Sequence, residues 1–190
     1  MSLQKYRRAQ LGEITDEIGV YALCDLDRVP IYVGQSVDGI RSRVRRHLSS
    51  ARSDVIANRQ LDVWEVAYVW AWPMPGASQE GVTHLECHLA NEFHRLKPLM
   101  GTIPAPPPNV PQIPDRQEVI ILPEEEIIKR RDPLLRLPRQ AMHFNNLFSH
   151  ILEVKDNEVL RAALAAHFDR LSSYYATFMS GPKESVEADS

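Results

Sequence analysis

Cysteine is scarce in this sequence. Cys24 and Cys87 are the only two thiols among its 190 residues. Two thiols cannot build a disulfide framework or a four-thiolate zinc site, and both lie in apolar patterns where a buried free cysteine is commonest. This cysteine usage favours a reducing compartment, the cytoplasm.

Long apolar runs are missing as well. No stretch approaches the roughly 20 apolar residues that span a bilayer, and the basic residues Lys5, Arg7 and Arg8 lead into no apolar signal-peptide segment. We therefore expect a cytoplasmic protein with no membrane partner. We expect no small-molecule cofactor either.

The chain also lacks an overall positive charge. Its formal net charge is −3 and its pI is near 6.2, which argues against a protein that coats nucleic acid through total charge. The distribution is uneven, however, because residues 39–59 carry six arginines against one acid, a local charge of +5. These are Arg41, Arg43, Arg45, Arg46, Arg52 and Arg59 against Asp54. A polyanion can dock at such a segment.

The N-terminal part has the pattern of a hairpin followed by a helix. Residues 18–24 and 30–34 are short β-prone runs separated by a turn-forming "DLDRV". Asp38 is a candidate cap for a helix over 39–50, in which Ile40, Val44 and Leu48 form one apolar stripe.

A third strand and a second helix follow. Residues 63–72, "VWEVAYVWAW", are rich in valine and aromatic residues and end at a proline. Residues 82–96 place apolar side chains on one helical face. The predicted fold class is α/β (α+β), with a small three-stranded mixed or antiparallel sheet flanked by helices.

A proline-rich segment divides the chain. Residues 103–114 contain six prolines in twelve residues, which indicates a stiff, extended connector. We expect a core over 1–102, this linker, a mainly helical region over 115–180 for DNA recognition or dimerisation, and a disordered tail over 181–190. The helical region is expected to contain a strand (118–122), an acidic turn (124–126) and two helices, over 139–153 and 156–178, with Asp156 as the candidate cap of the second.

Five side chains in the core form a chemical pattern. Arg43 and His47 are spaced i, i+4 on one helix, beside its apolar stripe, and Glu86 follows a core leucine on the second helix. Two strand tyrosines, Tyr21 and Tyr32, join them. A guanidinium for phosphate oxygens, a carboxylate for a hard divalent cation and groups that accept a proton suit phosphodiester hydrolysis.

These motifs resemble the GIY-YIG family of endonucleases. "GVY" at 19–21, "YVGQS" at 32–36, the helix "RSRVRRHL" and the later "HLECHL" stand in the family's order. The resemblance covers roughly residues 18–101. Either tripeptide alone is weak evidence, whereas the ordered set is specific.

The resemblance implies a role for each residue. Glu86 would hold one Mg²⁺ or Mn²⁺ ion, and Arg43 would stabilise charge on the phosphate. Tyr21, helped by His47, would deprotonate or orient the attacking water, and Tyr32 would contact the phosphate or a metal-held water. The products would carry 5′-phosphate and 3′-hydroxyl ends. Tyr21 could act as a base only if positive charge lowered its pKa from about 10, so the choice between Tyr21 and His47 stays open.

One position departs from the family pattern. Where the family usually carries an asparagine after the glutamate helix, this chain has Gly101. Asn91 and Asn109 are possible substitutes, although neither has the usual spacing.

Several alternatives remain open. Arg41, Arg45 and Arg46, with Gln35, are candidate DNA-binding residues, but a solvated helix face explains the arginines equally well. A zinc site at His84, Cys87 and His88 is disfavoured, because the spacing is not that of the metalloproteases. The expected function is a metal-dependent DNA endonuclease, of restriction, repair or mobile-element type, possible as a homodimer that cuts a palindrome. The alternative is a nucleic-acid-binding module without turnover.

Overall fold

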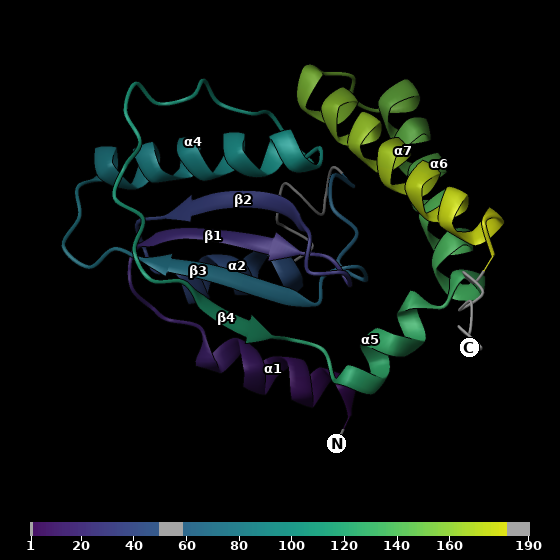
Figure 1. The fold of residues 1–190 in the computed structure, drawn as a ribbon, viewed down its shortest axis with the longest axis horizontal. Helices are drawn as coiled ribbons and strands as arrows, with labels where there is room; N and C mark the ends of the chain where they lie inside the picture. The colour runs from purple at the N-terminus through teal and green to yellow at the C-terminus, as the bar shows by residue number, and fades with distance from the viewer. Residues whose placement is uncertain (1, 50–58, 182–190) are drawn as a thin grey trace, which may run out of the picture.

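A computed structural model describes residues 2–49 and 59–181 of the chain. It shows an α+β fold in the order helix, hairpin, helix, strand, helix, strand and three helices (Figure 1). The helices are α1 (Leu3–Glu13), α2 (Ile40–Ser49), α4 (Gln79–Leu96), α5 (Glu124–Arg131), α6 (Pro133–Glu153) and α7 (Glu158–Met179). The strands are β1 (Gly19–Cys24), β2 (Pro30–Ser36), β3 (Tyr68–Pro73) and β4 (Gln117–Ile120).

The sheet has four antiparallel strands in the order β2-β1-β3-β4. The expected hairpin is confirmed, but the expected three-stranded sheet is wrong, because the strand expected over 118–122 forms at Gln117–Ile120 and joins the same sheet. The fourth strand comes from beyond the proline-rich segment and pairs with β3, with Val69 opposite Val119. Residues 101–116 contain neither helix nor strand, in keeping with a connector, yet this connector returns the chain to the same sheet.

The alternation along β1 gives the sheet two buried faces. Val20, Ala22 and Cys24 point to the cluster that includes Leu85 of α4, whereas Tyr21 and its neighbours in the opposite phase point to the cluster that includes α2. The predicted stripe of α2 is confirmed, because Ile40, Val44 and Leu48 are all buried there. The sheet therefore lies between α4 and α2 (Figure 1).

Some element boundaries differ from the predicted ones for local reasons. The strand expected over 63–72 begins only at Tyr68, because Asp62 starts a turn in which its carboxylate accepts a hydrogen bond from Trp64 N–H (3.1 Å). The acidic residues 124–126 form the first turn of α5 rather than a separate turn, where negative charge complements the helix dipole. Helix α1, capped by Ser2, was not predicted.

The C-terminal helices also begin at other residues than expected. Helix α6 starts at Pro133, because Asp132 accepts a hydrogen bond from Leu134 N–H (2.9 Å) and a proline is tolerated in a first turn. The cap of α7 is Asn157, not Asp156, which instead pairs with Arg161. The roles expected for this region, DNA recognition or dimerisation, stay predictions.

A buried ion pair joins α7 to the end of the hairpin. Arg170 donates to the Asp25 carboxylate at 2.7 Å, and both side chains are 2% exposed. Arg136 of α6 donates to Glu65 and Asp27 beside it. These charges hold the helical region against the sheet at the right of Figure 1.

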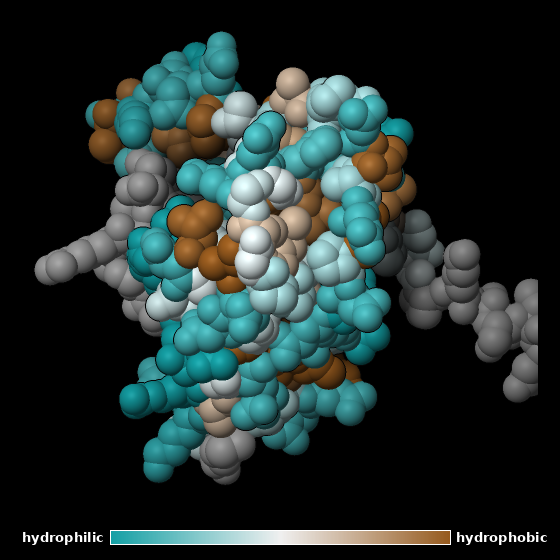
Figure 2. Space-filling view, turned by 90° about the vertical axis from the view of Figure 1, so that its left-hand side faces the viewer, coloured by the Kyte–Doolittle hydropathy of each residue, from teal (hydrophilic) through white to brown (hydrophobic). Residues whose placement is uncertain are grey.

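The surface opposite the C-terminal helices is largely hydrophilic, and its apolar residues appear as separate patches (Figure 2). Across residues 2–49 and 59–181, no helix has the length and apolar character to cross a bilayer. The tail expected over 181–190 lies, apart from Gly181, outside the described residues.

Candidate functional site

Three aromatic rings meet beneath the hairpin. Tyr21 and Tyr32 come from paired strands, and His47 comes from the last turn of α2. The ring centroids lie 6.2 Å apart for the two tyrosines, 6.0 Å for Tyr21 and His47, and 5.4 Å for Tyr32 and His47. The structure thus brings together three of the residues that the sequence singled out.

Steric crowding explains why both tyrosine motifs contain a glycine. Gly34 stands opposite Tyr21 in the ladder, and a Cβ there would lie 2.6 Å from Tyr21 Oη and 2.9 Å from Tyr32 Cε1. Gly19 has φ +149°, and a Cβ would meet the Trp72 carbonyl oxygen at 2.2 Å. The motifs are therefore packing requirements of the sheet as well as sequence markers.

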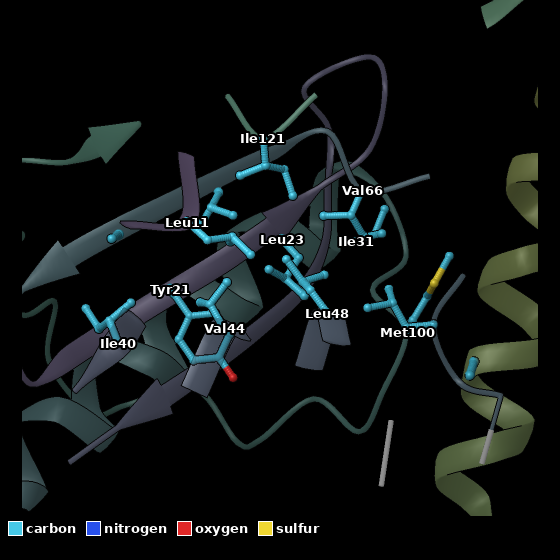
Figure 3. Packing of buried hydrophobic residues seen from close by; sticks show 14 of the residues in the cluster. Leu11, Tyr21, Leu23, Ile31, Ile40, Val44, Leu48, Val66, Met100 and Ile121 are labelled. Atoms are coloured by element: carbon cyan, nitrogen blue, oxygen red, sulfur yellow. The ribbon is translucent and has the colours of Figure 1, made fainter. Parts of the chain in front are cut away.

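Tyr21 is fully enclosed. Its side chain is 0% exposed, and its hydroxyl makes no hydrogen bond of good geometry with the residues that the structure describes. Burial, helped by Tyr32, raises the pKa of Tyr21 well above its usual value, although Arg43 opposes the shift. Figure 3 shows the ring beside Val44 with its oxygen directed away from Leu23. The phenol is therefore protonated at neutral pH and does not reach solvent in this conformation.

The charge of Arg43 acts on the two phenols and on the Glu86 carboxylate. It lowers the pKa of Tyr32 against the larger effect of burial, and it also lowers the pKa of Glu86. The Arg43 Nε atom is buried and makes no hydrogen bond within the described part of the chain. His47 is 4% exposed, so Arg43 and Tyr32 are the more accessible members on this side.

Glu86 belongs to α4 and reaches the outer edge of β2. The backbone N–H of Gln35, on that edge strand, donates a hydrogen bond to the Glu86 carboxylate and lowers its pKa. Burial nevertheless has the larger effect and raises the pKa of Glu86 above its usual value. Glu86 in turn raises the pKa of Tyr32.

A cavity of about 490 Å³ opens where these elements meet. Tyr32 and Glu86 line it together with Gln60 and Gly101. Val159 of α7 also lines it, so the C-terminal region contributes to its wall. Tyr21, Arg43 and His47 are not among the lining residues, although the rings of Tyr21 and His47 pack against that of Tyr32.

The donor set fits one hard cation. Glu86 supplies a single carboxylate in an open cavity, and its raised pKa means that a cation would relieve an unfavourable buried charge. Among the described residues, no group of three or more His, Cys, Asp or Glu side chains forms a metal cage. This leaves His84, Cys87 and His88 without the geometry of a zinc centre.

The candidate DNA-binding residues occupy different environments. Arg41 donates to the Ile14 carbonyl oxygen (2.6 Å) and faces Asp16, so it fixes the segment before β1. Gln35 accepts a hydrogen bond from Thr83 Oγ1 (3.1 Å) and ties β2 to α4. Arg45 and Arg46 are exposed on α2. Arg52, from the same basic segment, lies outside the described residues.

Neither candidate substitute for the family's asparagine lies at Gly101, which contacts Gln60 instead. Asn91 donates to the carbonyl oxygens of Cys87 and Pro104 (2.8 and 2.9 Å), so it anchors the chain after α4. Asn109 lines a separate hollow beyond that helix. At Gly101, a Cβ would lie 3.0 Å from the amide nitrogen of Gln60. Sequence reasoning missed Gln60, and no motif marks it.

Three comparisons with known proteins found no match. No family model, curated protein or solved structure matches the chain. The resemblance to GIY-YIG nucleases therefore depends on the motif residues alone.

Proposed function

We propose that the protein is a metal-dependent DNA endonuclease that hydrolyses phosphodiester bonds and leaves 5′-phosphate and 3′-hydroxyl ends. The observation that carries the proposal is the meeting of Tyr32 of β2 and Glu86 of α4 in the wall of one cavity. Arg43 of α2 supports it, because its charge lowers the pKa of both side chains. A surface acid, a helix-face arginine and a strand tyrosine with purely structural roles need not meet.

Each side chain has a proposed task. Glu86 would hold one Mg²⁺ or Mn²⁺ ion, which when bound supplies Lewis-acid polarisation of the phosphate. Arg43 would donate to the phosphate oxygens, where a guanidinium offers a planar pair of N–H groups. Tyr32 would orient the phosphate or the attacking water from the cavity wall.

The deeper residues would act through those in the cavity. Tyr21 would stay protonated and position Tyr32 and Arg43, because burial disfavours its phenolate. His47 is then the better candidate proton acceptor of the two, because a neutral imidazole keeps one ring nitrogen as an acceptor. The exposed Arg45 and Arg46 would contact the nucleic-acid backbone. A homodimer that cuts both strands stays part of this proposal.

Supercoiled plasmid provides the test. Purified protein with Mg²⁺ or Mn²⁺ should nick and linearise the plasmid, and the ends should be ligatable without prior phosphorylation. A protein that binds DNA but leaves the plasmid intact with either ion would be the non-cleaving module instead. A protein that neither binds nor cuts DNA would refute both.

A further inference from the structure

Gln60 is a buried amide in the wall of the candidate site. It is 7% exposed and lines the same cavity as Tyr32 and Glu86. Buried polar side chains require partners, so their orientation is fixed by hydrogen bonds. Gln60 lies in neither a helix nor a strand, and tertiary contacts must therefore direct it.

Contacts at both ends hold Gln60 in place. Its Nε2 donates to the Met100 carbonyl oxygen at 2.6 Å. Its own backbone oxygen lies 3.2 Å from His167 Nε2, on α7. Burial lowers the pKa of His167 to about 3, so this imidazole is neutral and must donate through Nε2. The second amide N–H and the amide oxygen are available to other partners, because Met100 O is the partner of the Gln60 side chain among the described residues.

A neutral amide has a particular use beside a carboxylate. Glu86 repels a phosphate, and apart from Gln60 only Tyr32 and Thr102 among the described wall residues carry a neutral side-chain donor. An amide donates to a phosphate or sugar oxygen without adding a second charge that would need compensation. We propose that Gln60 binds the sugar–phosphate strand in this cavity and fixes its position relative to Glu86. This inference rests on the proposed function and adds to it a strand-binding residue.

Gly101 makes the proposal open to a direct test. Its backbone is not in the left-handed region, and Gln60 Nε2, at 3.0 Å, is the atom among the described residues that an added Cβ would meet within 4 Å. An amide side chain can therefore be removed from position 60 and introduced at position 101, on the other side of this contact. Gln60→Ala removes it, Gly101→Asn crowds it, and the double variant restores an amide from the other side.

Single-turnover cleavage at saturating DNA should follow that logic. Gln60→Ala is expected to cleave about tenfold more slowly or worse, the effect of one hydrogen bond to a charged group. Gly101→Asn alone should also be slower. The double variant should recover to within about threefold of the wild type, so the two changes should be strongly non-additive. DNA affinity in Ca²⁺ and thermal unfolding are measured on the same proteins.

Two controls keep structural effects apart. Gln60→Met fills the space without an amide and should cleave about tenfold more slowly than the wild type. This variant tests the role of the amide even where Gln60→Ala fails to fold. Gln140→Ala removes a different buried glutamine, in α6, and should change stability but not the cleavage rate. Full-speed cleavage by Gln60→Met, or a double variant no faster than either single one, would overturn the role of Gln60 alone. A wild-type protein that cuts no DNA would overturn the proposed function as well.

Discussion

Gly34 faces Tyr21 across the hairpin, and the missing side chain at position 34 is the space that the Tyr21 ring occupies. An added Cβ would lie 2.6 Å from Tyr21 Oη and 2.8 Å from Cζ. The absence of a Cβ at Gly34 therefore allows both tyrosine rings to occupy their positions.

Gly34→Ala should accordingly reduce cleavage by displacing the aromatic rings, and it should destabilise the fold by about 1–3 kcal/mol through overpacking. Gly81→Ala is the matched control, because its Cβ would meet only Ser78 Oγ at 3.5 Å. In a helix this change should stabilise by about 0.5–1 kcal/mol. Chemical denaturation and cleavage rates on both variants check the prediction, which fails if Gly34→Ala behaves like Gly81→Ala.

Tyr21 should stay protonated far into the alkaline range. Because burial raises its pKa in the folded state, Tyr21 favours folding fully below the unfolded-state pKa of about 10, and this contribution declines as the pH rises above it. The ultraviolet titration of the wild type minus that of Tyr21→Phe should show no phenolate before alkaline unfolding. A Tyr21 phenolate at neutral pH would instead restore this residue as the general base.

Removing one member of the Asp25–Arg170 pair should strongly destabilise the fold. Arg170→Met leaves a buried carboxylate without its partner, and we expect a loss of about 3–5 kcal/mol in the free energy of unfolding. Adding Asp25→Asn should recover part of this loss. The measurement is denaturant unfolding of the single and double variants. If Arg170→Met unfolds at the wild-type denaturant concentration, the pair does not anchor α7.

Two arginines of α2 should separate into a structural and a DNA-binding one. Arg46→Ala should weaken DNA binding equally for all sequences and flatten the salt dependence by about 0.9 in slope, the contribution of one phosphate contact. Arg41→Ala should instead lower stability, because it loses the hydrogen bond to Ile14 O. Affinity titrations over a range of salt concentrations, with thermal unfolding alongside, distinguish them. Equal salt slopes for Arg46→Ala and the wild type would return Arg46 to the solvated surface.

Short-range sequence patterns correctly predicted the hairpin and the buried face of α2. Alternation and turn residues were enough for the β1–β2 hairpin, and an i, i+4 spacing identified the buried stripe of α2. Strand β4 pairs with β3 across the proline-rich segment. A segment of four residues carries too little periodicity to reveal such a distant partner.

The same limit applies to the candidate site. The motifs identified five residues, and the structure places Tyr21, Tyr32 and His47 in mutual contact. The motifs do not record burial, which raises the pKa of Tyr21 although Arg43 lowers it. Gln60 is directed by Met100 and His167, residues far away in the sequence, and no short-range pattern records that relationship.

Glu86 connects stability to the proposed chemistry. Burial raises its pKa, so the folded state loses stability as the pH rises through the ordinary carboxyl range and the unfolded chain ionises first. Glu86→Gln keeps the shape and removes the charge. Its thermal unfolding temperature at neutral pH, without metal, should therefore equal or exceed that of the wild type.

Cleavage and binding by Glu86→Gln, measured side by side with the wild type on one supercoiled plasmid, test the central claim most directly. We expect the wild type to nick and linearise the plasmid with Mg²⁺ or Mn²⁺, and Glu86→Gln to bind the same DNA with similar affinity without cutting it. Cleavage at the wild-type rate by folded Glu86→Gln would contradict the claim that this carboxylate is the centre of a hydrolytic site.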